Sequence, residues 1–130
     1  MILIVDDEVD ICWSLQHIFN NAGFPTTTST NARDALELLN NQMFSFVFID
    51  AMLPDIDGLD LANSIRQADC NVNIVMISGY YYEADISVQQ AINRGIVNAF
   101  ISKPFLQEEI ICILKKLNPE AFDAAIAKLE

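Results

Sequence analysis

The sequence predicts one α/β domain: a doubly wound, five-stranded parallel sheet with helices on both faces. Short apolar runs alternate five times with segments in which apolar residues recur at helical spacing. The chain has 130 residues, of which 52% are hydrophobic, so it has the usual size of one domain and enough apolar material for its core. Because crossovers between parallel strands are right-handed, this alternation folds into a single open sheet.

Residues 44–50 predict the strand around which the domain is organised. Their apolar run is interrupted only by Ser45 and leads directly to Asp50. Such a run is typical of a strand buried on both faces, and a carboxylate at its end costs free energy unless something binds it. Pro54 and Gly58 then turn the chain, which places Asp50 at the carboxyl edge of the sheet, where α/β proteins bind ligands.

The remaining elements follow from the same two patterns. Strands are predicted over apolar or β-branched runs at residues 2–5, 25–30, 73–78 and 98–102, the second near a sheet edge because it begins with proline. Helices are predicted at residues 11–21, 32–39, 58–66, 84–94 and 106–117. The domain proper is thus expected to cover residues 1–117. Residues 118–130 are expected to form an extension with a short extra helix, which is a cap, a dimer contact or the start of a linker to an output domain.

Charge and cysteine content limit the classes of function. The chain has 18 acidic and 7 basic residues, a net charge of −11, and phosphates of a nucleic acid would be repelled by it. The sequence has no run long enough to span a membrane and no basic lead-in typical of a signal peptide. Cys12, Cys70 and Cys112 lack metal-binding spacing. We therefore expect a cytoplasmic protein with reduced thiols and no direct interaction with nucleic acid or membrane.

Four of the five predicted strands lead into a polar residue that could take part in chemistry: Asp6 with Asp7, Asp50, Ser78 and Lys103. In a parallel sheet all of them share one edge. Three crowded carboxylates repel one another unless a cation lies among them, and Mg²⁺ is the usual ion at a partly hydrated site with few carboxylates. With an amine and a hydroxyl beside it, the cluster suits phosphoryl transfer to Asp50.

The motifs "VDDE", "FIDAMLPDIDG", "ISG" and "SKPF", in this order, resemble those of the receiver domain of two-component response regulators, the CheY-like superfamily. The resemblance covers residues 1 to about 117 and implies a flavodoxin-like strand order, 2-1-3-4-5. It also implies a signalling switch rather than a turnover enzyme. Asp50 would accept a phosphoryl group from a sensor histidine kinase or a phosphotransfer protein. The face made by the fourth helix, fifth strand and fifth helix would then change and act on a downstream output domain or protein.

The resemblance also implies how the acidic residues would hold a metal ion. Mg²⁺ would be bound by Asp7, by Asp50 and by the backbone carbonyl of Met52. Asp6 would act through a metal-bound water.

Other residues would contact the phosphoryl group or change conformation when it is present. Lys103 would pair first with Asp50 and then with a phosphoryl oxygen, and Ser78 would bond another oxygen. The Lys103–Pro104 peptide bond is expected to be cis. Phe100 stands where the family usually has a tyrosine that turns inward with Ser78, so a switch here would work by packing without a hydroxyl. Equally, Phe100 would be buried as an ordinary core residue of its strand.

Three tyrosines, Tyr80, Tyr81 and Tyr82, follow the fourth predicted strand beside the site. Grouped exposed aromatic side chains can mark a contact surface. We hypothesise that this segment and the helix after it form the partner-facing side. The alternative is a solvated loop with half-buried rings.

Three alternative functions have different sequence requirements. A haloacid-dehalogenase-like phosphohydrolase also uses an aspartate and Mg²⁺, but it needs a second aspartate where this chain has Met52. A flavodoxin-type cofactor binder needs a phosphate-binding loop after the first strand, where the acidic residues of this chain would repel phosphate. A pseudo-receiver, which acts as a protein-interaction module without phosphorylation, stays open as the alternative to the switch.

Overall fold

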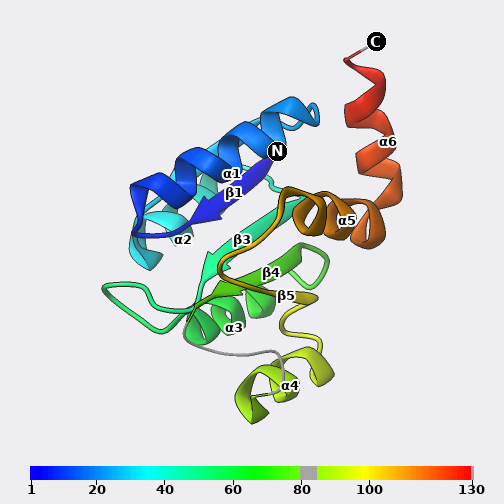
Figure 1. Cartoon of the computed structure of the whole chain (residues 1–130). Coiled ribbons are helices and arrows are strands. Elements are labelled where there is room, and N and C mark those ends of the chain that lie inside the picture. The colour runs from blue at the N-terminus through cyan, green and yellow to red at the C-terminus, as the bar shows by residue number, and fades with distance from the viewer. Residues whose placement is uncertain (80–84, 130) are drawn as a thin grey trace.

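The computed structural model describes residues 1–79 and 85–129, so the predictions for Tyr80, Tyr81 and Tyr82 lie outside the described residues. Strands and helices alternate along the chain as predicted (Figure 1). The strands are β1 (Ile2–Val5), β2 (Thr26–Ser29), β3 (Phe46–Asp50), β4 (Asn73–Ser78) and β5 (Ala99–Ser102). The helices are α1 (Val9–Asn21), α2 (Ala32–Asn41), α3 (Gly58–Ala68), α4 (Ile86–Asn93), α5 (Gln107–Leu117) and α6 (Pro119–Ala127).

The five strands form one sheet in the order β2-β1-β3-β4-β5, with every neighbouring pair parallel. This confirms the predicted doubly wound sheet with strand order 2-1-3-4-5, and it places β2 at an edge. The extra C-terminal helix is also confirmed, as α6, which lies beside α5 and carries the C-terminal end of the chain away from the sheet (Figure 1).

Short polar side chains set the beginnings of several helices. The side chains of Asn31, Asp57 and Asn118 accept hydrogen bonds from backbone N–H groups in the first turns of α2, α3 and α6. At the other end, Gly23 and Gly95 follow α1 and α4 with φ angles of 90° and 73°, in the left-handed region that favours glycine. Local sequence chemistry therefore fixes where three of the helices begin and where two of them end.

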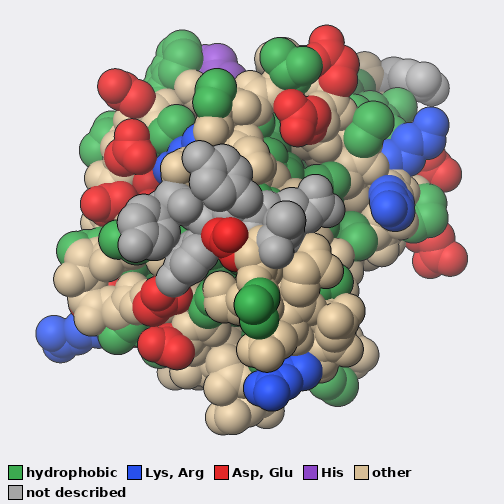
Figure 2. Space-filling model, turned by 60° about the horizontal axis from the view of Figure 1, so that its bottom comes forward, with side chains coloured by type: hydrophobic (Ala, Val, Ile, Leu, Met, Phe, Trp, Pro, Cys, Tyr) green, Lys and Arg blue, Asp and Glu red, His purple; other side chains and the backbone are tan. Residues whose placement is uncertain are grey.

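Acidic residues outnumber basic ones in this chain, 18 to 7. On the face in Figure 2, acidic side chains are spread widely and the basic ones are scattered among them, in keeping with the net charge of −11. All three cysteines are free thiols. None of the helices that the structure describes has both the length and the apolar composition needed to cross a membrane.

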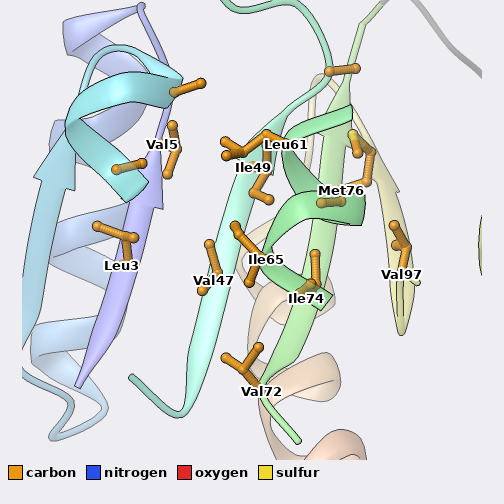
Figure 3. Packing of buried hydrophobic residues seen from close by; sticks show 14 of the residues in the cluster. Leu3, Val5, Val47, Ile49, Leu61, Ile65, Val72, Ile74, Met76 and Val97 are labelled. Carbon is orange, nitrogen blue, oxygen red and sulfur yellow. The ribbon is translucent and has the colours of Figure 1, made fainter. Parts of the chain in front are cut away.

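Alternate residues along the strands face two separate hydrophobic layers. One layer packs against α2 and α3, and its strand residues are Leu3, Val5, Val47, Ile49, Ile74 and Met76. Figure 3 shows Leu61 and Ile65 of α3 lying over this face of the sheet. The opposite layer packs against α1 and α5, and its strand residues are Ile2, Ile4, Phe46, Phe48, Val75 and Ile77. The central strands are thus buried on both faces, and their polar end residues emerge only at the carboxyl edge.

Candidate functional site

Two acidic residues emerge side by side because of the register between β1 and β3. Val5 pairs with Ile49, so the residues that follow, Asp6 and Asp50, occupy equivalent positions on neighbouring strands. Asp6 is only 1% exposed and Asp50 only 6% exposed. Asp7 is exposed. One carboxylate oxygen from each of these three aspartates lies within 4.8 Å of the other two, so the structure brings together the three acids that the sequence predicted to share one edge.

Lys103 supplies the positive charge at this edge. It follows β5, which is separated from β3 by β4. Its Nζ donates hydrogen bonds to three carboxylate oxygens: Asp6 Oδ2 at 2.9 Å, Asp50 Oδ1 at 3.3 Å and Glu8 Oε1 at 3.3 Å. The Lys103–Pro104 peptide bond is cis. One amine therefore links acids that come from both β1 and β3.

Glu8 is a site residue to which the sequence analysis gave no role. Its backbone N–H donates to Asp6 Oδ1 at 2.9 Å, and its own carboxylate reaches the amine of Lys103. The only signal in the sequence is a third acidic residue after Asp6 and Asp7. Sequence spacing gives no reason to pair it with a lysine 95 positions later in the chain.

Ser78 is the last residue of β4, at this edge of the sheet. Phe100 lies within β5, two residues before the strand ends. Ser78 is 1% exposed and pairs in register with Ser102, and its carbonyl oxygen accepts a hydrogen bond of 2.9 Å from the backbone N–H of Lys103. This backbone hydrogen bond therefore holds Ser78 beside Lys103. Phe100 is half-buried, pairs in register with Met76 and packs against the layer that contains Met76. Its predicted part in a switch stays a prediction.

The electrostatics of the cluster favour neutralisation of its acids. Burial, together with the nearby charge of Asp6, raises the pKa of Asp50 to about 6, although Lys103 opposes the shift. Burial also raises the pKa of Asp6. Burial by itself would lower the pKa of Lys103, but hydrogen bonding and charge from Asp6, with Asp50 and Glu8, raise it, so the lysine stays protonated. One ammonium group thus only partly compensates several carboxylates.

The turn after β3 depends on a close approach of the backbone at Gly58. The N–H of Gly58 donates to the carbonyl oxygen of Ala51 at 2.8 Å. A Cβ atom at this position would overlap the carbonyl oxygen of Asp50 and the Cα of Ala51. The sequence analysis predicted a turn at Gly58, and the structure gives its physical reason, since only glycine leaves room for the chain to fold back onto the end of β3.

The donor set fits a hard divalent cation. It consists of carboxylate oxygens from Asp6, Asp7 and Asp50, and carboxylates with raised pKa values gain from a cation among them. Mg²⁺ prefers such oxygen ligands and keeps several waters, which an exposed Asp7 allows. Met52 lies in the loop two residues after Asp50, and its backbone carbonyl stays a predicted ligand.

A family model described as the response regulator receiver domain matches residues 2–115. The chain belongs to this family. The match is therefore to a receiver domain and not to the phosphohydrolase or flavodoxin alternatives.

Three relatives show how far the similarity of this receiver domain extends. Sporulation initiation phosphotransferase F of Bacillus subtilis is 30% identical over 118 residues, which cover 91% of this chain and 93% of that protein. Response regulator protein PilR of Pseudomonas aeruginosa is 34% identical over 128 residues, 95% of this chain but only 28% of PilR. The crystal structure of response regulator protein TrrA from Thermotoga maritima, in complex with Mg²⁺-BeF, is 27% identical with a TM-score of 0.78, covering 89% of this chain and 96% of that one.

Proposed function

We propose that this receiver domain is a phosphorylation-controlled switch of a two-component phosphorelay, with Asp50 as the phosphoacceptor. The proposal rests on one observation, the gathering of three carboxylates and one amine at the carboxyl edge of the sheet. The oxygens of Asp6, Asp7 and Asp50 lie within 4.8 Å of one another, and Lys103 Nζ is 3.3 Å from Asp50 Oδ1. A carboxylate nucleophile beside a fixed ammonium group suits the transfer of a phosphoryl group.

In the proposed reaction a carboxylate oxygen of Asp50 attacks the phosphorus atom of a donor phosphohistidine. The new P–O bond forms as the P–N bond breaks, and the electron pair of that bond leaves with the donor imidazole, which takes up a proton. Lys103 moves a hydrogen bond from Asp50 to a phosphoryl oxygen, and the hydroxyl of Ser78 donates to another. Asp7, Asp50 and the Met52 carbonyl would hold Mg²⁺, with Asp6 acting through a metal-bound water, and the bound ion would compensate the phosphoryl charge.

We further propose that the phosphoryl group acts on the face made by α4, β5 and α5. Ser78 and Lys103 are joined through their backbones, and Phe100 lies on the same strand that leads to Lys103. A movement of Ser78 towards the phosphoryl group changes the space open to Phe100, which turns inward by packing alone. Phosphorylation then shifts an existing equilibrium between two arrangements of this face.

The proposed partners follow from this mechanism. A sensor histidine kinase or a phosphotransfer protein supplies the phosphoryl group, and a downstream output domain or protein reads the changed face, in the cytoplasm. Support comes from TrrA, whose structure holds Mg²⁺-BeF, and from PilR, which extends well beyond the matched region. We assign the receiver domain proper to residues 1–117 and treat residues 118–130, with α6, as an extension.

Labelling with acetyl phosphate and binding of beryllofluoride test the proposed function, each with and without Mg²⁺. We expect the wild-type chain to gain one phosphoryl group, detected by intact-protein mass spectrometry, only when Mg²⁺ is present. Asp50→Asn should abolish labelling because the nucleophilic oxygen is lost. Asp10→Asn is the matched control: it removes the same charge from an exposed position in the first turn of α1, and it should be labelled like the wild type.

The same measurement separates the switch from the pseudo-receiver. A wild-type chain that takes up neither phosphoryl group nor beryllofluoride at any Mg²⁺ concentration would support the pseudo-receiver. Labelling that persists in Asp50→Asn would show that another residue is the acceptor.

A further inference from the structure

Asp55 joins the loop after β3 to the beginning of a different helix. It lies five positions after Asp50, in the segment between β3 and α3. Its Oδ1 accepts a hydrogen bond of 2.9 Å from the N–H of Ala32, and its Oδ2 accepts one of 2.9 Å from the N–H of Arg33. Both donors belong to the first turn of α2, 23 and 22 residues earlier in the chain.

These two bonds complete the cap of α2, which has a local cap of its own. Asn31 is the local N-cap, and its Oδ1 accepts a 2.8 Å bond from the N–H of Asp34. The first N–H groups of a helix have no partners within the helix and need acceptors from elsewhere. The side chain of Asn31 accepts from the N–H of Asp34. The N–H groups of Ala32 and Arg33 find their acceptors in Asp55, which comes from another part of the fold. Two residues thus cap the same helix end, but only one of them belongs to the site loop.

Asp55 also shapes its own loop. Its Oδ1 accepts a further bond of 3.2 Å from the N–H of Ile56. The hydrogen bonds from the N–H groups of Ala32 and Arg33 hold the pKa of Asp55 below its usual range, so the side chain is a charged acceptor at the positive end of α2. Met52, whose backbone carbonyl is a proposed ligand, stands three residues before Asp55 in the same loop.

We propose that Asp55 is a positioning residue, which ties the loop after the phosphoacceptor to α2 and thereby holds that loop where the acidic site can bind a divalent cation. The inference rests on the proposed function, because the loop contributes to the cation site by the backbone carbonyl of Met52, which is a proposed ligand. It adds a residue that touches neither the ion nor the phosphoryl group. Residues that orient metal ligands in this indirect way have large effects on metal affinity.

Two variants that weaken the same helix end from opposite sides test the inference. Asp55→Ala releases the loop and uncaps Ala32 and Arg33, whereas Asn31→Ala removes the local cap and leaves the loop attached. Both should shift the midpoint of urea unfolding to a lower urea concentration by similar amounts, because each variant removes acceptors from the same helix end. Only Asp55→Ala should weaken Mg²⁺ binding, by about tenfold, as measured by titration calorimetry with Mg²⁺ alone.

Amide hydrogen exchange in the metal-free protein gives a second readout. Loss of Asp55 should speed exchange in the loop around Met52 and Ile56, which loss of Asn31 should not. Asp55→Asn keeps one acceptor oxygen and should fall between the wild type and Asp55→Ala, which provides a test in a milder variant if Asp55→Ala folds poorly.

The outcomes separate the inference from the function on which it rests. If the wild type binds Mg²⁺ but Asp55→Ala and Asn31→Ala bind it equally well, Asp55 is only a helix cap and the inference is wrong. If the wild type does not bind Mg²⁺ at all, the proposed function and the inference both fail.

Discussion

At the scale of single residues, the central feature is a buried carboxylate that the surrounding protein only partly neutralises. Burial and the charge of Asp6 raise the pKa of Asp50, and the amine of Lys103 lowers it without cancelling the shift. In the metal-free protein, ionised Asp50 therefore reduces the stability of the fold. Such an arrangement is common at functional sites, where stability is lower than the sequence could otherwise reach.

This imbalance predicts how stability depends on pH without divalent ions. The pKa of Asp50 is about 6 in the folded protein, whereas an unperturbed aspartate has a pKa of 3.8, so the folded protein keeps a proton that the unfolded chain releases between these values. Stability therefore falls as the pH rises through this window. Asp50→Asn has no carboxyl group to ionise and does not lose stability in this window. It should therefore be more stable than the wild type above pH 7, by about 1–3 kcal/mol. The two proteins should converge below about pH 4.

Urea unfolding followed by circular dichroism, repeated across this pH range in the presence of a chelator, measures the difference. A difference that does not change with pH would show that the stability of Asp50→Asn comes from packing and not from the removed charge.

Much of the site could be predicted residue by residue, because its residues stand where strands end. Asp6, Asp7, Asp50, Ser78 and Lys103 follow apolar runs, and a parallel sheet collects such positions at one edge. The contact of Glu8 with Lys103 could not be predicted, since it depends on the path of a side chain across the sheet. The reason for glycine at position 58 could not be predicted either, because it depends on how closely the backbone there approaches Asp50 and Ala51.

At the scale of elements, α6 is packed against the domain and does not stand free. Ala125 is 5% exposed, and half-buried Ala121 and Phe122 pack against the same layer as α1 and α5. The turn after α1 meets α6 directly, since a Cβ atom on Gly23 would overlap the carbonyl oxygen of Ala125. The extension therefore packs on one end of the domain, and its role as a cap, a dimer contact or the start of a linker stays a prediction.

Two glycines with similar backbone angles allow this contact to be measured. Gly23 and Gly95 have φ of 90° and 73°, but nothing lies within 4 Å of a Cβ built on Gly95. Gly95→Ala should therefore cost only the left-handed conformation, about 1–2 kcal/mol. Gly23→Ala should cost about 1–3 kcal/mol more, because the added methyl also collides with α6.

Chemical denaturation gives both values, and amide exchange in α6 should become faster in Gly23→Ala alone. Equal costs for the two substitutions, with unchanged exchange in α6, would mean that α6 does not depend on this contact.

Element types were easier to predict than the links between elements. Each helix and strand showed its periodicity, and the predicted limits differ from the observed ones by a few residues, as for α3, which extends to Ala68 beyond the predicted 66. By contrast, Arg66 donates from α3 to the carbonyl oxygens of Val72 and Ile96 and to Asn98 Oδ1. No local pattern indicates such a bridge, because its acceptors come from segments before β4 and β5.

At the scale of the whole molecule, the net charge of −11 means that the folded chain repels itself. Two kinds of cation should relieve the repulsion in different ways. Monovalent salt screens all surface charges at once, whereas a divalent ion at the acidic edge acts at one place. The distinction gives a test that needs no partner protein.

Thermal unfolding should separate the two effects. Sodium chloride should stabilise the wild type, Asp50→Asn and Asp10→Asn by similar amounts. Mg²⁺ at about a hundred times its dissociation constant should add about 2.7 kcal/mol to the wild type and to Asp10→Asn, at constant ionic strength. Asp50→Asn should gain much less, since one of the three acids has become neutral. An equal gain in all three proteins would place the ion elsewhere.

The ion pair between Lys103 and Asp6 joins residues 97 positions apart, on strands that bracket β3 and β4 in the sheet. During synthesis, the acids that follow β1 and β3 are made long before Lys103, whose ammonium group partly compensates their charge. A nascent chain that does not yet contain β5 therefore lacks Lys103 and its contacts with Asp6 and Asp50. Under the proposed function, a chain that ends before β5 would lack Lys103 and would be a poor phosphoacceptor even if its first strands were folded.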